Sequence, residues 1–336
     1  MAPAGLRFPA GRRFSDALRG RARGGKFCVS NTGCPDRIGA EKTPVEPDSV
    51  HTDEGMFATW QRAAGGGLFR LTPRDIMPGS QQPLSLNEQV VLVTGGARGL
   101  GAHIVRAFQR EGARVVVNYF RSAGSAAALA AQRPDRTLAI MADVRDDGAV
   151  KAMVNQAQQH FGAQVTTVVN NALPDFQFNG DQRHQADALT WEDIHHQMEG
   201  TVRGALNTIQ AVLPGMRKLG FGRVINVGTN LFQNPVVPYH DYTAAKAALL
   251  AFTRTLSHDL GPEGITVNMV SGGLLRTTDA SAATPEAVFE FIAATTPLRR
   301  VTTPAEFADA LLFFASPWSR SVTGQNLVVD GGLVHN

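Results

Sequence analysis

Tyr242 and Lys246 are a pair of residues whose types and spacing could move a proton. They stand four positions apart in a stretch of helical periodicity, so they share one face of the helix predicted there. A free phenol has a pKa of about 10 and is a poor acid or base at neutral pH. A nearby ammonium favours the phenolate and lowers that pKa. We therefore predict that Tyr242 exchanges a proton with the oxygen of a carbonyl or an alcohol.

A glycine-rich segment, Thr-Gly-Gly-Ala-Arg-Gly-Leu-Gly over residues 94–101, follows the first predicted strand. Glycines between a strand and a helix allow a tight turn and let backbone N–H groups approach a pyrophosphate at the positive end of the helix. Three glycines alone are weak evidence, but their place between a strand and a helix is typical of a dinucleotide site. The segment therefore predicts a nucleotide cofactor.

Short apolar runs rich in β-branched residues recur along the chain, and amphipathic stretches of helical periodicity separate them. Near-continuous apolar runs are typical of strands buried on both faces of a parallel sheet. We therefore predict an α/β fold, a single Rossmann-type, doubly wound parallel sheet of about seven strands, which binds ligands beyond the carboxyl ends of its strands. The expected strands are residues 90–94, 114–119, 137–141, 166–170, 222–228, 265–270 and 326–330.

The spacing of the glycine segment, Thr-Gly-x-x-x-Gly-x-Gly, together with the Tyr242–Lys246 pair, resembles the short-chain dehydrogenase/reductase family. Four further segments match the family's motifs in order: Ala142-Asp143-Val144, Asn170-Asn171-Ala172, Thr323-Gly324-Gln325 and Asp330-Gly331-Gly332. The resemblance covers residues 88–333. Within the family the chain is most similar to the 3-oxoacyl-(acyl-carrier-protein) reductase group, judging by VVVNYFRS and TGQNLVVDGG.

The resemblance implies roles for further residues. It places Thr229 where the family usually has the serine whose hydroxyl bonds the substrate oxygen, and it gives Lys246 a second role in holding the nicotinamide ribose. It places Thr201, which offers one hydroxyl in place of an amide, at the position of a catalytic Asn. Gly272-Gly273 stands where Pro-Gly is common beside the nicotinamide.

The end of the second predicted strand indicates which cofactor is preferred. An acid there would bind the ribose hydroxyls of NAD, but residues 118–122, Asn-Tyr-Phe-Arg-Ser, carry no carboxylate. The guanidinium groups of Arg121 and Arg98 suit the 2′-phosphate of NADP, which we favour over NAD. The expected cofactor-binding residues are Gly95, Arg98, Gly99, Leu100, Gly101, Asn118, Tyr119, Arg121, Ser122, Asp143, Val144, Asn171, Ala172, Tyr242, Lys246 and Gly273.

Residues 1–76 differ from the rest in composition. Gly, Pro, Arg and Ser dominate there without a sustained period of 2 or 3.6. This segment holds 12 basic and 8 acidic residues, whereas residues 77–336 hold 20 and 21, so a nucleic-acid partner is not expected. An organelle transit peptide, a disordered tail and a start placed too early are all open, and we favour the last two. We expect a chain beginning at Met77 to fold and turn over like the full one.

Membrane, disulfide and metal chemistry are not expected. No apolar run approaches the roughly 18 residues of a membrane span. Cys28 and Cys34 cannot build a disulfide framework, and their spacing is not that of a zinc site. Adjacent His195 and His196 point to different faces of a helix, so they do not share a metal. A cysteine-free folded part is compatible with the reducing cytoplasm, where we expect the protein.

The function expected from the sequence is an NADP-dependent oxidoreductase that interconverts a ketone and a secondary alcohol. Its substrate would be a small carbonyl compound or a 3-oxoacyl thioester, with Phe176 and Phe178 as candidate walls of the substrate site. The resemblance implies a homotetramer built through the helices at 190–219 and 240–260. The threonines at positions 201 and 229, together with Gly272, leave a second interpretation open, a catalytically impaired dinucleotide-binding regulatory or scaffold protein.

Overall fold

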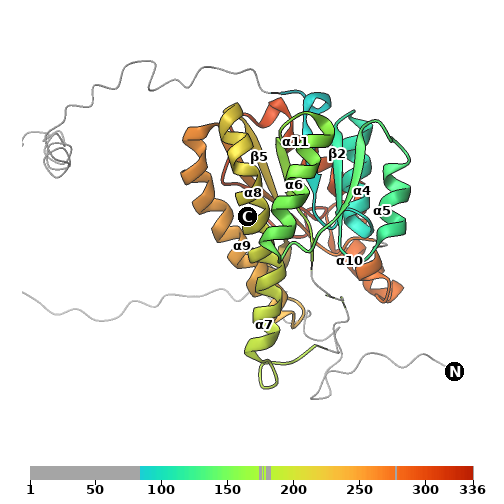
Figure 1. The fold of residues 1–336 in the computed structure, drawn as a ribbon. Helices are drawn as coiled ribbons and strands as arrows, with labels where there is room; N and C mark the ends of the chain where they lie inside the picture. The colour runs from blue at the N-terminus through green and yellow to red at the C-terminus, as the bar shows by residue number, and fades with distance from the viewer. Residues whose placement is uncertain (1–83, 174–175, 177, 179–182, 277, 336) are drawn as a thin grey trace, which may run out of the picture. The chain divides into compact units, whose positions relative to one another are not determined.

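The computed structural model describes residues 84–335, apart from 174–175, 177, 179–182 and 277 (Figure 1). The predicted N-terminal extension therefore lies outside the described residues. Seven parallel strands form one sheet in the order β3-β2-β1-β4-β5-β6-β7. The strands are β1 (Val90–Val93), β2 (Arg114–Tyr119), β3 (Thr137–Met141), β4 (Thr167–Asn170), β5 (Gly222–Thr229), β6 (Ile265–Gly272) and β7 (Asn326–Val329). The predicted α/β fold is confirmed, and every strand boundary lies within two residues of its expected place.

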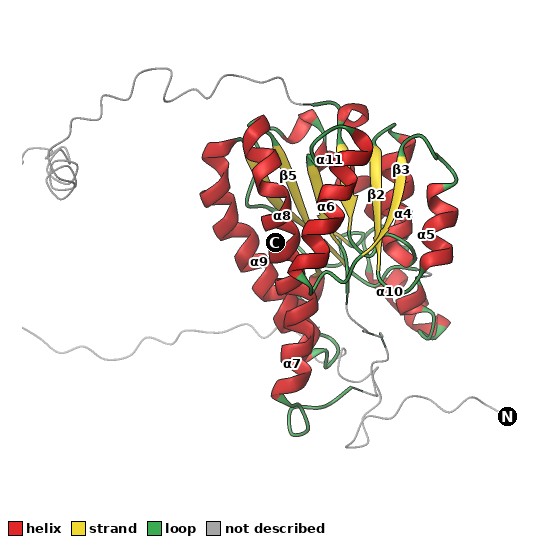
Figure 2. Ribbon diagram, viewed as in Figure 1, coloured by secondary structure: helices red, strands yellow, loops and turns green. Residues whose placement is uncertain are grey.

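Helices cover both faces of the sheet (Figure 2). They are α4 (Gly99–Arg110), α5 (Ala123–Ala130), α6 (Asp147–Phe161), α7 (Trp191–Met198), α8 (Gly204–Leu219), α9 (His240–Leu260), α10 (Glu286–Thr295) and α11 (Pro304–Ala315). Buried side chains of α4, α5 and α11 pack on one face, and those of α6, α8 and α9 pack on the other. Within the described residues no helix combines the length and the apolar composition needed to cross a bilayer.

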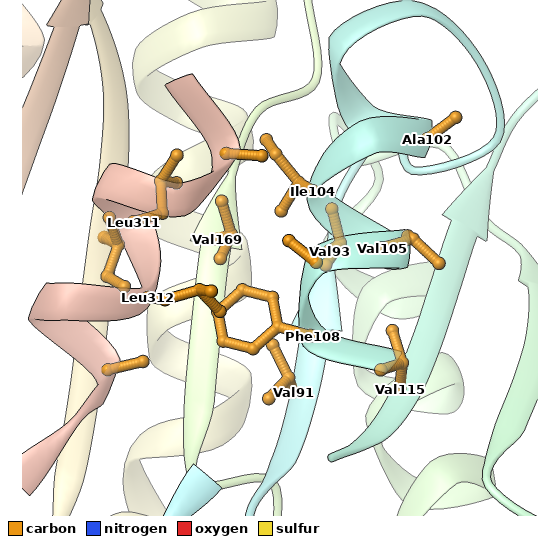
Figure 3. Packing of buried hydrophobic residues seen from close by; sticks show 14 of the residues in the cluster. Val91, Val93, Ala102, Ile104, Val105, Phe108, Val115, Val169, Leu311 and Leu312 are labelled. Atoms are coloured by element: carbon orange, nitrogen blue, oxygen red, sulfur yellow. The ribbon is translucent and has the colours of Figure 1, made fainter. Parts of the chain in front are cut away.

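The first helix after β1 is anchored by its apolar face. Phe108 of α4 is fully buried and lies between Leu312 of α11 and the sheet, close to Val91 of β1 and Val169 of β4 (Figure 3). Full burial of a side chain of this size stabilises the fold by about 1.5–3 kcal/mol. This packing fixes α4 on the sheet, so that its N-terminus stays beside the carboxyl end of β1.

The long helix expected over residues 190–219 is interrupted. A π-helical turn, Glu199–Arg203, joins α7 to α8. Such turns insert an extra residue into the helix and are frequent at functional sites. This one contains Thr201, whose side chain is buried toward the sheet side of the helix pair rather than in solvent.

The strand order reverses between β1 and β4. From β1 the chain builds outward to β2 and β3, and from β4 it builds in the opposite direction to β7. In open α/β sheets a ligand binds in the crevice beyond the carboxyl ends of the strands at such a point. The fold therefore directs attention to the residues that follow β1 and β4.

Candidate active site

The glycine segment turns sharply between β1 and α4. Gly95 and Gly99 adopt the left-handed conformation, with φ of 60° and 51°, which disfavours any side chain. At Gly101 a Cβ atom would overlap the carbonyl oxygen of Gly95 and would lie 2.8 Å from Nδ2 of Asn171. The turn is therefore closely packed, and the first N–H groups of α4, which have no helical acceptor, stand where an anion can bind.

The end of β4 is hydrogen-bonded to this turn. The Thr94 hydroxyl accepts from the backbone N–H groups of Asn171, at 2.9 Å, and Ala172, at 3.0 Å. The Asn171 side chain donates in return to the carbonyl oxygens of Thr94, at 3.0 Å, and Gly95, at 3.2 Å. Asn171 and Ala172 are thus brought to the glycine turn as expected. Thr94 was not among the predicted site residues, although its hydroxyl at the strand end was the available signal.

Asn118 at the end of β2 shapes the same turn. Its Oδ1 accepts from the Gly95 N–H at 3.2 Å, and its Nδ2 donates to the Ala142 carbonyl at 2.9 Å. Its backbone carbonyl accepts from the Gly96 N–H at 2.8 Å. Because the side chain is buried and both its polar atoms are engaged, Asn118 would act on a cofactor by holding the glycine turn.

Beyond β2 the chain presents the predicted phosphate-binding residues. Arg121 is exposed, and its guanidinium carbon lies 5.5 Å from the ring centroid of Phe120. Arg98 is the exposed N-cap residue of α4, and Tyr119 and Ser122 are half-buried. Arg98 thus lies within the glycine segment, and Tyr119, Arg121 and Ser122 lie at or just after the end of β2; that they bind a phosphate stays a prediction.

Asp143 after β3 already has a cationic partner. Its carboxylate accepts from Arg145 Nη2 at 2.7 Å and from Arg145 Nε at 3.0 Å. These hydrogen bonds hold the pKa of Asp143 below its usual value, and the charge of Arg121 lowers it further. The next residue, Val144, accepts from Asn207 Nδ2 at 2.9 Å through its carbonyl. The role of Arg145 in orienting Asp143 was missed by the sequence reasoning.

The three candidate catalytic residues at β5 and α9 come together. Thr229 ends β5, and Tyr242 and Lys246 lie in the first two turns of α9. All three are buried, with exposed fractions of 4%, 5% and 3%. Thr229 lies close enough to the Tyr242 hydroxyl to lower its pKa. Lys246 Nζ donates to the Val227 carbonyl at 2.6 Å and lies 5.8 Å from the centroid of the Tyr242 ring.

The expected effect of Lys246 on the pKa of Tyr242 is wrong for this structure. Burial raises the pKa of Tyr242 to about 12, and the hydrogen bond from Thr229 offsets this only in part. Burial also lowers the pKa of Lys246 to about 8. Loss of water on burial disfavours both charged forms. Tyr242 is therefore a neutral phenol at physiological pH.

Thr201 faces the same buried region. It lines a cavity of about 10 Å³ together with Lys246 and Asn170, which is the size at which a buried space begins to hold one water molecule. Among the described residues, Thr201 Oγ1 and Asn170 Oδ1 have no hydrogen-bond partner. The fourth predicted residue thus lies beside Lys246, with polar atoms that suit a water.

Aromatic side chains cover Tyr242. The Phe176 ring stacks on it at 4.5 Å between centroids and 26° between planes, and Phe178 meets it edge-on at 5.7 Å. Tyr239 packs against both phenylalanines. We call Phe176, Phe178, Tyr239 and Tyr242 the aromatic cluster. The two candidate wall residues therefore do contact the candidate proton donor.

Gly273 follows β6 and packs on a pair that the sequence reasoning missed. A Cβ atom there would lie 3.0 Å from Asn230 Nδ2 and 3.2 Å from Asp330 Cβ. Asn230 Nδ2 donates to Asp330 Oδ2 at 2.9 Å, and the Asp330 carboxylate also accepts from backbone N–H groups of the last turn. The pair ties the segment after Thr229 to the end of the chain.

His184 and His195 each lie beside a nearby carboxylate. His184 Nδ1 lies 3.0 Å from Oδ2 of Asp193, which also caps the start of α7. In the part of the chain that the structure describes, no three His, Cys, Asp or Glu side chains are grouped as metal ligands.

Known proteins resemble this chain over the whole described region. A family profile described as enoyl-(acyl carrier protein) reductase matches residues 95–334. A 3-oxoacyl-[acyl-carrier-protein] reductase of Pseudomonas aeruginosa is 35% identical, over 74% of this chain and 99% of its own length. A 3α-hydroxysteroid dehydrogenase of Mediterraneibacter gnavus is 34% identical, over 74% of this chain and 98% of its own length. A probable galactose dehydrogenase of Rhizobium meliloti is 32% identical over 76% of this chain and 99% of its own length.

Solved structures agree with these relatives. The crystal structure of a gluconate 5-dehydrogenase from Burkholderia cenocepacia, in complex with NADP and tartrate, matches with a TM-score of 0.67 and 29% identity, over 76% of this chain and 97% of that one. The family profile, the relatives and the seven-stranded fold thus agree with the motifs read from the sequence. The chain belongs to the short-chain dehydrogenase/reductase family of oxidoreductases.

Proposed function

We propose that residues 77–336 form an NADP-dependent oxidoreductase domain that interconverts a ketone and a secondary alcohol. The observation that carries the proposal is the burial of Thr229, Tyr242 and Lys246 together at β5 and α9, with Thr229 close enough to the Tyr242 hydroxyl to lower its pKa. A pair of hydroxyls in this setting suits one oxygen atom that alternates between carbonyl and alcohol.

The residues around the glycine turn fit a dinucleotide. The left-handed Gly95 and Gly99 and the closely packed Gly101 leave the N-terminus of α4 open to a pyrophosphate. Arg98 and Arg121 would bind a 2′-phosphate, and Lys246 would hold the nicotinamide ribose. When bound, the nicotinamide supplies or accepts the hydride of the reaction.

The protein's own residues would handle the proton. Tyr242 is protonated at neutral pH because burial raises its pKa to about 12, so it can donate to the carbonyl oxygen as that oxygen gains negative charge. The Thr229 hydroxyl would donate a second hydrogen bond to the same oxygen. Lys246, whose pKa is about 8, keeps a proton close to Tyr242, and the cavity that it shares with Thr201 suits a water that would restore that proton.

A 3-oxoacyl thioester is the finer substrate proposal. It is supported by the 35% identical 3-oxoacyl-[acyl-carrier-protein] reductase and by the motifs quoted for that group. The test is oxidation of NADPH, followed at 340 nm, with a panel of ketones and an acyl thioester. Steady oxidation that depends on a carbonyl compound is expected. No turnover with any carbonyl compound would contradict the proposal.

Thr201 in the π-helical turn supports a second candidate function. Thr201 Oγ1 is buried and has no partner among the described residues, so a dinucleotide-binding regulatory or scaffold protein with impaired turnover is the second candidate. The same assay separates the two, because such a protein would bind NADPH, detectable as a change in cofactor fluorescence, without oxidising it.

Two replacements of Thr229 should distinguish the contribution of its hydroxyl to activity from that of its side-chain shape. Thr229→Ser keeps the hydroxyl and should stay within about tenfold of the wild-type kcat/KM, whereas Thr229→Val should lose roughly 10²-fold or more, as when one donor to a developing oxyanion is removed. The measurement is kcat/KM for one ketone at saturating NADPH. A Val variant with wild-type activity would exclude Thr229 from the chemistry.

The preference for NADPH over NADH should depend on the charged side chains that follow β2. Charge-assisted hydrogen bonds contribute roughly 1.5–3 kcal/mol each, so one contact to the 2′-phosphate predicts a ten- to hundredfold preference for NADPH over NADH, at about 1.4 kcal/mol per decade. Tyr119→Asp would repel the phosphate and accept from free ribose hydroxyls, which moves the preference toward NADH. The measurement is kcat/KM for both cofactors with one ketone. A wild type that prefers NADH would overturn the assignment.

We extend the proposal to a homotetramer in the cytoplasm. Large apolar side chains remain exposed on separate surfaces, including Trp191 of α7, 72% exposed, Trp318 after α11, 81% exposed, and Leu327 of the edge strand β7. Exposed apolar groups of this size favour burial between subunits. The described residues contain no cysteine, which suits a reducing compartment. Sedimentation velocity would measure the assembly.

A further inference from the structure

Asn170, the last residue of β4, lines the small cavity beside Lys246 with an oxygen atom to spare. Among the described residues, Asn170 Oδ1 and Thr201 Oγ1 have no hydrogen-bond partner, and both residues line this cavity of about 10 Å³. The two residues are 6% and 3% exposed, so bulk solvent does not serve them. Buried polar groups are almost always hydrogen-bonded, because an unpaired one keeps the full cost of losing water. The cavity is where a partner for both would fit.

A chain of buried hydrogen bonds determines which atom of Asn170 is left over. The Thr253 hydroxyl donates to the Leu249 carbonyl at 2.8 Å, so toward Asn226 it can only accept, from Nδ2 at 2.9 Å. Asn226 Oδ1 is then the acceptor for Asn170 Nδ2, at 2.9 Å. The amide of Asn170 therefore has its donor engaged and presents an acceptor on its free side.

The sheet brings this acceptor to the same face as Lys246. Asn170 and Asn226 are opposite each other in the β4–β5 ladder. Because side chains alternate along a strand, Asn170 lies on the face of Val168, which is part of the core packed by α6, α8 and α9. Lys246 reaches that face from α9. Its Nζ has three N–H groups, of which one donates to the Val227 carbonyl at 2.6 Å, so two remain for other acceptors.

The donors and acceptors around the cavity suit one water molecule. A buried water typically makes about three hydrogen bonds. Here it would accept from Lys246 Nζ, donate to Asn170 Oδ1, and bond Thr201 Oγ1, whose hydroxyl can donate or accept. Thr94 also lines the cavity, but its hydroxyl already donates to the Val169 carbonyl and accepts from two backbone N–H groups. The orientation of the water would thus be set by Lys246 and Asn170.

A water bound in this way would restrain the Lys246 ammonium from two strands. The Val227 carbonyl holds Nζ from β5, and the water would connect it to Asn170 at the end of β4. A lysine ammonium is a point charge on a flexible stem, so a second anchor narrows the positions that it can take. Its position matters because Nζ lies 5.8 Å from the centroid of the Tyr242 ring.

We propose that Asn170 is a positioning residue, which holds the ammonium of Lys246 beside Tyr242 through one bound water. The inference rests on the proposed ketone reductase function and adds a residue to it. An amide oxygen reaches the cavity from β4, so the threonine at position 201 does not leave the cavity without one.

The first experiment looks for the water and needs no activity. A crystal structure of the full chain, at a resolution that shows ordered waters, should place one water within about 3.2 Å of Lys246 Nζ, Asn170 Oδ1 and Thr201 Oγ1. No water there, or a direct contact between Lys246 Nζ and Asn170 Oδ1, would overturn the inference and leave the oxidoreductase function standing.

The second experiment moves the amide across the cavity. Asn170→Ala should lower kcat for ketone reduction at least about tenfold, because displacement of a catalytic group by roughly 1 Å can cost about 10²-fold. It should also lower the Tm, since Asn226 Oδ1 loses its donor. Asn170→Ala combined with Thr201→Asn returns an amide to the cavity and should restore kcat to within about threefold of wild type. The Tm should stay below wild type, because Asn226 does not line the cavity and its donor is not replaced.

Asn268→Ala is the matched control. Asn268 is a fully buried asparagine of the neighbouring strand β6, and its side chain donates to the Val322 carbonyl and accepts from the Gln325 N–H. It does not line the cavity, so its alanine variant should lower the Tm while kcat stays within about threefold of wild type.

A kcat that Asn170→Ala leaves unchanged, or a loss that Thr201→Asn does not restore, would show a merely structural role for Asn170 and overturn the inference. If Asn170→Ala does not fold, the crystal structure of the wild type decides. A wild type that turns over no ketone would contradict the proposed function, and the presence of the water would then decide separately whether Asn170 holds Lys246.

Discussion

Tyr242→Phe should lower kcat for ketone reduction by about 10²–10⁴-fold, the range typical of general acid catalysis, and should leave the Kd for NADPH within about twofold of wild type. The variant removes only the phenol hydroxyl, which lies close to Thr229. Its ring remains to stack with Phe176, so the aromatic cluster and the position of α9 are retained. The measurements are single-turnover NADPH oxidation for kcat and fluorescence titration for Kd.

Tyr239→Phe is the matched control for this prediction. Tyr239 lies in the same cluster, 5.3 Å from the Phe176 ring, and is as deeply buried as Tyr242. It has no lysine four residues later, since position 243 is Thr and Lys246 is seven residues on. Its Phe variant should therefore keep kcat within about threefold of wild type. Near-normal turnover by Tyr242→Phe would remove Tyr242 from the proton-transfer step.

Gly101→Ala should abolish useful cofactor binding and destabilise the fold together. The added methyl group would overlap the Gly95 carbonyl oxygen and crowd Nδ2 of Asn171. The neighbour at closest approach is backbone, so the glycine turn itself must shift away from the N-terminus of α4. Such overpacking costs roughly 1–3 kcal/mol, and each kcal/mol lowers the Tm of a domain of this size by about 2–4 °C. The Kd for NADPH should rise by at least about tenfold.

Gly124→Ala provides the control for Gly101→Ala. A Cβ atom at Gly124 in α5 would meet no heavy atom within 4 Å, and its φ is not left-handed. Alanine is favoured over glycine in a helix by roughly 0.5–1 kcal/mol, so this variant should be as stable as wild type or slightly more so, with unchanged Kd. The two quantities are obtained by thermal unfolding and by NADPH titration. Tight binding by Gly101→Ala would show that the turn does not carry the cofactor.

The fold was predictable because its signals are local. The central strands are short apolar runs whose burial on both faces needs no knowledge of their neighbours, and the Tyr242–Lys246 spacing alone places both side chains on one helix face. The glycine turn was likewise evident from its position between a strand and a helix. Even so, the partners of Asn118 could not be predicted, because Ala142 reaches it from the next strand.

Features of the site that arise from distant residues escaped prediction. The pKa of Tyr242 was predicted in the wrong direction because burial, to which the stacked Phe176 from the segment after β4 contributes, raises it. The Arg183–Asp241 pair joins positions 58 residues apart, and no spacing rule relates them. The π-helical turn at Glu199–Arg203 lies in a stretch whose periodicity resembles that of an ordinary helix.

The contacts between the segments that follow β1 and β4 also affect how the newly made chain folds. Thr94 and Asn171 are separated by 77 positions, and contacts between such distant positions form slowly during folding. The crevice at this junction exists only after the two halves of the sheet have paired. A ligand that binds only the paired state stabilises it by about 2.7 kcal/mol at a hundred times its Kd. If a dinucleotide binds here, its concentration would thus set the fraction of newly made chain in which the two halves of the sheet are paired.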